Sequence, residues 1–544
     1  MIVQTTQPLI DLSRSGDYFW ALLPEIFLAL WAMGVLLADV FQKGNRSEPS
    51  RPLIPWLSLG GLFLTALLNG WVFARMMPGS ETGTADWGLA AGPAMIAMDG
   101  VRFFSNYVIL LAAGLAIVMS MGYLDRRGIN RGEFHALVLF AALGMMLMAG
   151  SRDLLMVFIA LELMSIAIYV LVGFDRLDAR STEGSLKYFL LGAFSSAFFL
   201  FGIALTWGAT GTSDIAQIGE LISGGAVKVT PMLLAGMGML MVGFGFKVAA
   251  MPFHMWTPDA YDGAPTPVTA LMSTGVKAAA FAAFIRVFVQ GFGGAYEHWV
   301  EITGLLAMIT MIGGNLVALT QGSVKRMLAY SSIAHAGYLL VALAAGRGSG
   351  VAAFLFYLLI YTLMTAGAFA LVVANSNEHG EERVALEDWA GFAHQKPLLA
   401  AMFGVFLLSL AGFPLTAGFL GKIYILRSAV DAGLAPLAVV LVLASLLSYF
   451  YYLRVIVVMY MRPARTPDEH RHAWLPRPAM AATALAAVLV VGLFFFGGVS
   501  TRSVTGPMRW AERSAATLFS RPAGAQFPAG APAPAVQPAV ARLP

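Results

Sequence analysis

Cysteine is absent from the 544 residues of this sequence. Disulfide bonds, thiolate metal sites and iron–sulfur clusters held by cysteine are therefore excluded for this chain. If the protein takes part in a redox process, the electrons are expected to travel through other chains.

Charge is also scarce, because only 12% of the residues are charged while 58% are hydrophobic. A soluble globular domain averages about 25% charged and about 45–50% apolar residues. Even a large soluble domain leaves much of its surface in water, so a chain of this length cannot hide so much apolar surface inside. The composition excludes a soluble enzyme and a disordered protein. The net charge of +4 is too small to indicate a nucleic-acid-binding patch.

Long apolar runs fill most of the chain instead. A helix needs about 20 apolar residues to cross the hydrocarbon core of a bilayer, and the sequence has about fourteen such runs. Strict alternation of apolar and polar residues is absent, which argues against a β-barrel. The runs lie near 18–40, 53–75, 102–124, 134–150, 153–174, 185–209, 231–252, 263–290, 299–320, 326–346, 351–375, 397–430, 434–461 and 479–499.

The basic residues of the loops predict an orientation. Loops that follow odd-numbered runs hold about sixteen Lys and Arg residues, against about seven in the other loops, so the odd loops are predicted to face the cytoplasm and both termini the outside. Residues 501–544 form an Ala/Pro-rich tail, which from about residue 515 has no periodicity and is predicted to be extended and dispensable.

Six ionisable side chains stand within apolar runs, where a charge is costly and marks an ion path or a buried pair. Three of them have about two helical turns or more of apolar residues on each side, and we interpret these as functional. The other three have a structural alternative, either reaching to the membrane interface or packing as a satisfied histidine. The first three are Glu162, Lys247 and Lys277, and the others are Lys187, Lys422 and His335.

The chemical types of these residues suit proton transfer. Burial disfavours the charged form of a lysine, and a neighbouring carboxylate favours it, so a lysine between the two effects can exchange a proton near neutral pH. A protonated lysine cannot bind a metal cation, which favours protons over sodium as the transported ion and predicts no metal site.

Helix breakers accompany two of the lysines. Pro252 follows Lys247, and a Gly–Pro–Gly pattern in residues 412–418 precedes Lys422. A proline kinks a helix, and broken helices within a membrane are tolerated where they line a cavity. The two breaks lie about 165 residues apart, which suggests an internal repeat. The polar seam after Pro252, which includes His254, is either an interfacial connector or a site of proton uptake.

Two segments carry a family resemblance. KVAAMPFHMWTPDAYDGAPTPVTALMSTGVKAAAFAAFIR, which begins at Lys247, and VKRMLAYSSIAHAGYLL, which contains His335, resemble the antiporter-like membrane subunits of bacterial proton-pumping NADH:quinone oxidoreductase, respiratory complex I. The resemblance covers about residues 100–460. Lysine at 277 and at 422 makes the sequence most similar to chain N, since chain M has a glutamate at the second position and chain L has a long lateral helix.

The resemblance implies an all-α membrane protein of about 14 helices, with two inverted five-helix repeats in which helices 7 and 12 are broken. The implied divisions are N-terminal helices 1–3, a first repeat, a second repeat, helix 14 and the tail. Their boundaries are 1–125, 126–292, 293–465, 466–500 and 501–544.

The resemblance also implies roles. Glu162 would pair with Lys247, and Lys187 would lie between them or modulate the pair. Lys277 would bridge two half-channels, and Lys422 would pass the proton to the far side. The histidines would assist, His254 near helix 7 and His335 on the central axis.

The same resemblance places this chain in the bacterial cytoplasmic (inner) membrane as a subunit of a proton translocase. Its partners would be the other membrane-arm and peripheral-arm subunits and the lipid bilayer, with no nucleic acid. The chain itself would hold no cofactor, since NADH, FMN, the iron–sulfur clusters and the quinone would belong to partner subunits. The alternatives are an Mrp-type sodium/proton antiporter subunit, which Lys277 disfavours, and a scaffold with a vestigial ion path, which the complete lysine row disfavours.

Overall fold

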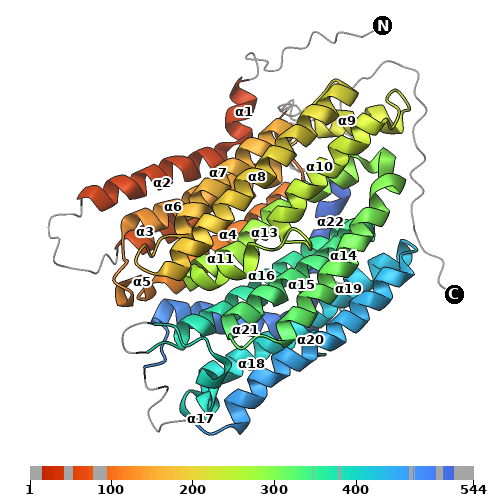
Figure 1. The fold of residues 1–544 in the computed structure, drawn as a ribbon. Helices are drawn as coiled ribbons and strands as arrows, with labels where there is room; N and C mark the ends of the chain where they lie inside the picture. Colours follow the sequence, from red (N-terminus) through yellow and green to blue (C-terminus); the bar gives the residue numbers. More distant parts are fainter. Residues whose placement is uncertain are drawn as a thin grey trace.

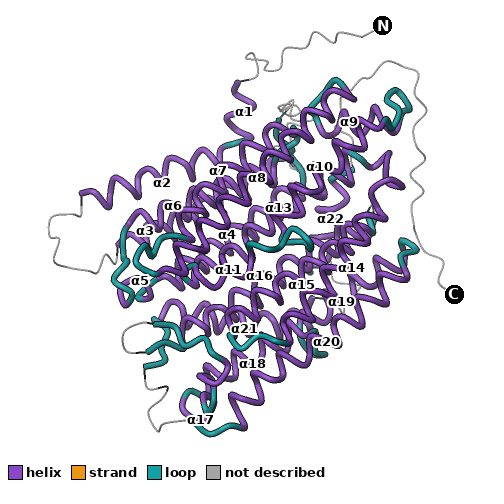
Figure 2. Tube along the Cα trace, in the orientation of Figure 1, coloured by secondary structure: helices purple, strands orange, loops and turns teal. Residues whose placement is uncertain are grey.

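The structure is a computed structural model that describes residues 15–41, 53–76, 95–346, 348–377, 381–464, 470, 472–497 and 506–519. Within these residues every regular element is a helix, apart from four isolated β-bridges. The long helices lie side by side in one bundle (Figure 1). Loop segments occur at the ends of the bundle and also inside it, where spans are interrupted (Figure 2). The predicted all-α fold is confirmed.

The helices of the N-terminal part are α1 (Ser15–Ala21), α2 (Leu23–Phe41), α3 (Leu53–Met76), α4 (Gly100–Ser120), α5 (Tyr123–Arg126), α6 (Gly132–Gly150), α7 (Leu154–Val172), α8 (Ala179–Thr210) and α9 (Ile215–Ser223). The central helices are α10 (Pro231–Val248), α11 (Thr257–Gly263), α12 (Thr266–Leu271), the π-helical η3 (Met272–Val276), α13 (Lys277–Ile285), the π-helical η4 (Arg286–Gly291) and the short 3₁₀ helix η5 (Gly293–Ala295). The remaining helices are α14 (Tyr296–Leu319), α15 (Val324–Ala344), α16 (Ser349–Ala374), the 3₁₀ helix η6 (Leu386–Trp389), α17 (Phe392–Gln395), α18 (Pro397–Ala411), α19 (Ala417–Asp431), α20 (Ala435–Met461), α21 (Arg477–Gly497) and α22 (Pro507–Thr517).

Thirteen spans of the described residues are long and apolar enough to cross a membrane. The one remaining predicted run, 397–430, is divided into the shorter helices α18 and α19. Only residues 151 and 152 separate the predicted runs 134–150 and 153–174. The second helix begins directly after Asp153, whose carboxylate accepts hydrogen bonds of 2.8 and 3.3 Å from the backbone N–H groups of Leu155 and Met156. Asp153 therefore caps α7 and separates it from α6.

Two sets of five spans pack in the same order. In the first set α6 packs on α7, α7 on α8, and α8 on both parts of a broken span, α10 and α11. In the second set α14 packs on α15, α15 on α16, and α16 on both parts of a broken span, α18 and α19. The last span packs on the first part of the broken one in both sets, α13 on α10 and α20 on α18. This order matches the predicted five-helix repeats, whereas the boundaries of the predicted divisions stay predictions.

Burial separates an inner group of helices from an outer group. The most apolar stretch of Thr266–Gly291 is 100% buried, and those of α15 and α16 are each 94% buried, whereas those of α2, α3, α8 and α20 are each 33% buried. The outer helices expose large apolar side chains such as Phe63, Phe194 and Phe450. An apolar exterior of this kind suits lipid or neighbouring membrane subunits.

The two ends of the bundle differ in what they hold. We call the end that carries α9 the α9 end, and the opposite end, which carries α5 and α17, the α5 end (Figure 1). At the α9 end Arg286 donates two hydrogen bonds to Asp99, at 2.5 and 2.9 Å, and Arg102 forms a 2.7 Å ion pair with Glu25. From the sequence, both arginines were expected to be loop charges. Arg286 is 0% and Arg102 is 1% exposed, and both join helices to one another.

Helix α22 lies within the range predicted as a tail. It packs on α4 and α16 through a face that includes Met508, Ala511 and Ser514. Thr517 Oγ1 accepts a 2.7 Å hydrogen bond from the backbone N–H of Gly100, and the Trp510 ring lies 4.4 Å from that of Phe104. The apolar spacing of 507–517 has helical periodicity, which the surrounding Ala/Pro-rich composition obscured. The predicted tail beyond residue 519 lies outside the described residues.

We predict that truncation after residue 505 destabilises the protein, whereas truncation after Phe519 does not. Loss of α22 uncovers apolar surface on α4 and α16 and removes the hydrogen-bond partner of the Gly100 N–H, which by itself contributes about 1 kcal/mol. The thermal midpoint of the detergent-solubilised protein should fall for the shorter chain and match that of the full chain for the longer one. Equal midpoints for both truncations would contradict this role of α22.

Candidate functional site

Lys247 lies in the last turn of α10, where the first broken span is interrupted, and is 2% exposed. Its ammonium donates hydrogen bonds to Ser165 Oγ of α7 at 2.7 Å and to the Tyr188 hydroxyl of α8 at 3.2 Å. The helix ends because Ala249 adopts a left-handed conformation with φ 62°. The negative end of the α10 dipole and the two hydroxyl oxygens therefore stabilise a buried cation.

Glu162 is half-buried on α7 and does not contact Lys247 directly. Its Oε1 accepts a 2.5 Å hydrogen bond from Ser196 Oγ of α8. Glu162, Ser165 and Tyr169 follow one another on one face of α7, and Ser165 is the member that bonds to Lys247. The predicted pair is therefore electrostatic, with no direct hydrogen bond or ion pair between the carboxylate and the ammonium.

Lys277 begins α13 in the middle of the innermost span and is 1% exposed. Its ammonium donates hydrogen bonds to the carbonyl oxygen of Ser332 and, at 2.6 Å, to Ser332 Oγ of α15. The hydroxyl of Tyr361 on α16 donates a 2.9 Å hydrogen bond to the same Oγ. The predicted central lysine thus lies between the two repeats, as a bridge requires.

His335 lies one turn beyond Ser332 on α15 and is 1% exposed. Its Nδ1 is 2.7 Å from the hydroxyl of Tyr357 and its Nε2 is 3.3 Å from that of Tyr452. Its ring is stacked on Tyr357 and lies 5.2 Å from the ring of Tyr361. Both ring nitrogens thus have hydroxyl partners, which satisfies the buried ring and connects it to two tyrosines.

Lys422 lies on α19, just beyond the second break, and is 6% exposed. Its ammonium donates hydrogen bonds to the last carbonyl oxygens of α18, Leu410 O at 3.0 Å and Ala411 O at 2.8 Å, and lies 4.9 Å from the centre of the Tyr338 ring. Gly412 ends α18 with φ 84°, and a Cβ there would lie 2.9 Å from Lys422 Cδ. The break therefore creates the site that receives the lysine.

Aromatic rings connect Lys247 to the partner of Lys277. The Trp256 ring is stacked on Tyr188 at 4.2 Å and lies 6.1 Å from the ring of Tyr261. The Tyr261 hydroxyl faces the side chain of Ser332. The residues of this column come from the seam between α10 and α12 and from α8, so the break in the first span places aromatic hydroxyls between the two lysines.

Lys187 and the polar seam lie at the α5 end. Lys187 forms ion pairs with Asp259 at 2.8 Å and Glu183 at 2.5 Å, and its side chain is 43% exposed. It therefore lies at the rim of the bundle. The resemblance implied that Lys187 lies between Glu162 and Lys247 or modulates that pair, and the first of these two expectations is wrong. His254 is half-buried, and its Nδ1 has no hydrogen-bond partner among the described residues.

Sequence reasoning missed the hydroxyl groups that connect the lysines. Each buried lysine or histidine of the row bonds to a serine or tyrosine, or to the carbonyls of a helix end. Serine and tyrosine are ordinary residues of membrane helices, so nothing in their spacing distinguished Ser165 or Tyr357 from packing residues. The signal that could have found Ser165 is its position one turn from Glu162.

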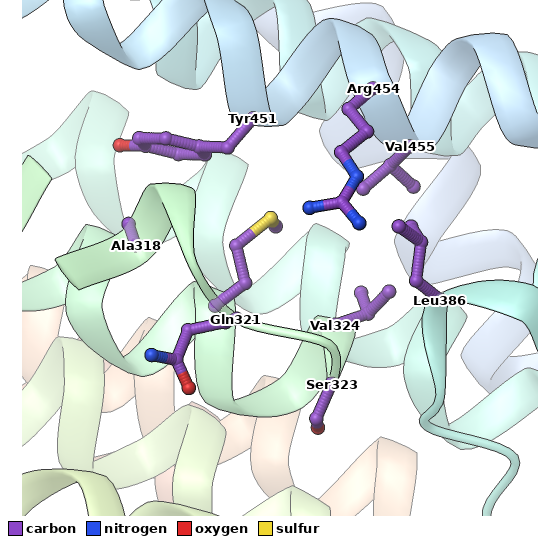
Figure 3. Close-up of a pocket in the computed structure, with 9 residues that line it drawn as sticks. Ala318, Gln321, Ser323, Val324, Leu386, Tyr451, Arg454 and Val455 are labelled. Atoms are coloured by element: carbon purple, nitrogen blue, oxygen red, sulfur yellow. The ribbon is translucent and has the colours of Figure 1, made fainter. Parts of the chain in front are cut away.

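A pocket among the described residues lies apart from this row. Figure 3 shows a small pocket at the α5 end, into which Tyr451 and Arg454 of α20 project above Gln321 and Leu386. None of the predicted site residues lines this pocket. Among the described residues, no group of three or more His, Cys, Asp or Glu side chains could hold a metal ion.

Comparisons with known proteins identify the family. A family model described as "NADH:quinone oxidoreductase/Mrp antiporter, TM" matches residues 151–448. NADH-quinone oxidoreductase subunit N of Trichlorobacter lovleyi is 45% identical over 87% of this chain and 93% of its own length. The subunit of the same name from Salinibacter ruber is 42% identical over 90% of this chain and 97% of its own length.

Solved structures agree with these relatives. A chain of respiratory complex I from Thermus thermophilus, solved with bound aureothin, is 37% identical, with a TM-score of 0.71 over 87% of this chain and 97% of that chain. A chain of the Mrp complex from Dietzia is 21% identical with a TM-score of 0.73 over 93% of this chain and 98% of that chain, which is a likeness of fold alone. The chain therefore belongs to the family of NADH-quinone oxidoreductase subunit N, the membrane subunits of respiratory complex I that share the antiporter-like fold.

Proposed function

We propose that this chain carries protons across the bacterial inner membrane along Glu162, Lys247, Lys277, His335 and Lys422, driven by quinone reduction in partner subunits. The observation that supports this most is the set of hydrogen-bond partners of Lys247, Lys277 and Lys422, which are hydroxyl and carbonyl oxygens and not carboxylates. The redox cofactors, NADH, FMN, iron–sulfur clusters and quinone, belong to those partner subunits in this proposal, and this chain acts as a translocase without a redox centre.

Such partners suit a group that changes its protonation state. An ammonium donates three hydrogen bonds, whereas a neutral amine donates two and accepts one. Ser165 Oγ and Ser332 Oγ can accept from the ammonium and, after rotation of the hydroxyl, donate to the amine. At Lys422 the two N–H groups of a neutral amine are enough for the carbonyls of Leu410 and Ala411. Both protonation states of each lysine can thus be satisfied.

The sides of the membrane follow from the loop charges. The α5 end holds the loops richer in Lys and Arg, so we assign it to the cytoplasm, and both termini to the periplasm. In this arrangement Lys187, Asp259 and His254 lie where protons are taken up, and α19 leads outward from Lys422. The fold alone does not distinguish this pump from an Mrp-type sodium/proton antiporter, but the relatives of high identity are all subunits N.

We expect Lys247→Ala to lower proton pumping and quinone reduction together, by about tenfold or more, because the transfer step loses its only amine. Removing one partner from a buried polar cluster also costs about 3–5 kcal/mol, so assembly is measured separately. Lys228→Ala, which changes an exposed lysine, is the matched control. Normal pumping by a fully assembled Lys247→Ala complex would exclude the lysine from the relay.

Glu162→Gln should impair pumping, whereas Glu162→Asp should retain part of it. The amide can still accept the hydrogen bond from Ser196, but it has no charge with which to stabilise the Lys247 cation. The comparison is made as protons moved per NADH in vesicles, with Glu220→Gln as the control on an exposed glutamate. A Gln variant as active as the wild type would show that the charge at 162 is not needed.

The Lys422→Arg variant tests whether Lys422 releases a proton or only anchors its helix at the membrane interface. Arginine keeps the positive charge but does not deprotonate in proteins, since its pKa lies above about 12. We expect the assembled variant to lose most of its pumping, while Arg427→Lys, at a side chain that is 74% exposed, remains active. If protons moved per NADH and the rate are both unchanged in Lys422→Arg, the residue is an anchor and the exit step needs another group.

A further inference from the structure

A buried ion pair outside the proposed relay joins three segments at the α5 end. The Lys325 ammonium, in the first turn of α15, forms a 2.9 Å ion pair with Glu382 and donates a 2.8 Å hydrogen bond to the carbonyl oxygen of Ala264. The side chains of Lys325 and Glu382 are 4% and 9% exposed. The pair thus connects the start of α15, the segment before η6 and the junction between α11 and α12.

Glu382 has one carboxylate oxygen to spare. Oε2 is used by Lys325, whereas Oε1 is buried and has no hydrogen-bond partner within 3.5 Å among the described residues. The hydroxyls of Thr266 and Tyr123 face the carboxylate, and the Arg127 guanidinium is within electrostatic range. Burial acts to raise the pKa of Glu382, but Lys325 and these hydroxyls outweigh it and hold the pKa below its usual value. The carboxylate is therefore ionised at neutral pH.

Hydroxyl side chains lead from Glu382 along the innermost span. Thr266, Thr269 and Ser273 are spaced by three and four residues, and Lys277 follows four residues later. Residues at these spacings lie on one face of a helix, so the three hydroxyls and the amine form a row of about 16 Å, 11 residues at about 1.5 Å each. All four side chains are 0–1% exposed. The π turn that contains Ser273, η3, lies directly before Lys277, and π turns are frequent at functional sites.

The hydroxyls in this region are not all committed to the backbone. Thr266 Oγ1 and the Tyr261 hydroxyl are buried and have no partner at hydrogen-bond distance within the part of the chain that the structure describes. Thr269 Oγ1 donates to the carbonyl oxygen of Tyr261 at 2.9 Å, and Ser273 Oγ to that of Ala270 at 3.0 Å, which leaves the lone pairs of both hydroxyls open. Buried polar groups without protein partners are ordinarily satisfied by water. The face is therefore suited to a chain of hydroxyls and water.

We propose that Glu382 takes up protons at the α5 end and that Thr266, Thr269 and Ser273 conduct them to Lys277, with Lys325 as the positioning residue for the carboxylate. This inference rests on the proposed proton transport and adds an uptake route that reaches the central lysine directly. It differs from the route through the seam of α11, where Lys187 and Asp259 lie.

The transfer balances as a proton relay. A hydronium ion at the α5 end protonates Glu382 Oε1 and leaves water. The carboxylic acid passes its proton to a hydroxyl or a bridging water, which releases its own proton to the next oxygen. The last O–H bond breaks as an N–H bond forms on the neutral amine of Lys277. Because the ion pair keeps the pKa of Glu382 low, the carboxylate passes the proton on and does not retain it.

The test compares Glu382→Gln with Glu381→Gln, a neighbouring exposed glutamate, in vesicles that hold the whole respiratory complex. The amide keeps the shape and the hydrogen bond to Lys325 but cannot take up a proton. Without the carboxylate the route loses its first proton acceptor, so we expect the rate of NADH-driven pumping at pH 7 to fall about tenfold or more. Glu381→Gln and Glu382→Asp should keep most of the wild-type rate.

A second pair of variants keeps the test decisive if Glu382→Gln does not assemble. Thr266→Val removes the first hydroxyl at similar volume, and Thr266→Ser retains it, so we expect the first to pump about tenfold more slowly and the second to behave as the wild type. A wild-type rate for assembled Glu382→Gln or Thr266→Val overturns the uptake route, while impaired Lys247→Ala and Lys422→Arg leave the proposed function standing. Normal pumping in all of these variants overturns both.

Discussion

The cost of burying an ammonium group in an apolar bundle is the constraint on which the rest of this structure depends. An unpaired charge in a medium of low dielectric constant is strongly disfavoured, so each buried lysine must find oxygen atoms inside the protein. Lys247 and Lys277 find serine and tyrosine hydroxyls, and Lys422 finds the carbonyls at the end of a helix. The positions of serines, tyrosines and helix ends in the core follow from this requirement.

The helix breaks also supply oxygen partners for buried ammonium groups, in this case from the backbone. An intact membrane helix uses all its carbonyls internally, and only an interrupted one presents free carbonyls inside the bilayer. Lys422 bonds to two such carbonyls, and Lys247 lies in the last turn before the other break. Left-handed residues, Ala249 and Gly412, end the first half of each broken span. Along the chain, Lys247 precedes its break and Lys422 follows its break.

The sequence predicted the spans, the two broken helices and the buried row because each depends on a local signal, namely apolar length, proline and glycine, or a charge flanked by apolar turns. What it could not predict depends on partners far away in the chain. Arg102 and Arg286 were predicted to be loop charges, because the sequence around them does not indicate that they pair with Glu25 and Asp99. Lys325 read as a loop charge for the same reason, because its partner Glu382 lies 57 residues on. Glu162 and Lys247 have no direct contact, because each bonds to a hydroxyl of its own, Ser196 for Glu162 and Ser165 for Lys247.

The contact between α22 and α4 also bears on how the protein is made. Gly100 and Thr517 are 417 residues apart, and the hydrogen bond between them closes the α9 end of the bundle. During synthesis α4 emerges and inserts long before the segment that covers its first turn exists. The buried arginine pairs beside that turn can form before α22 exists, but the surface above them is completed only when α22 has been translated. This side of the molecule is thus completed by a contact between segments 417 residues apart, and not by the insertion of α4 itself.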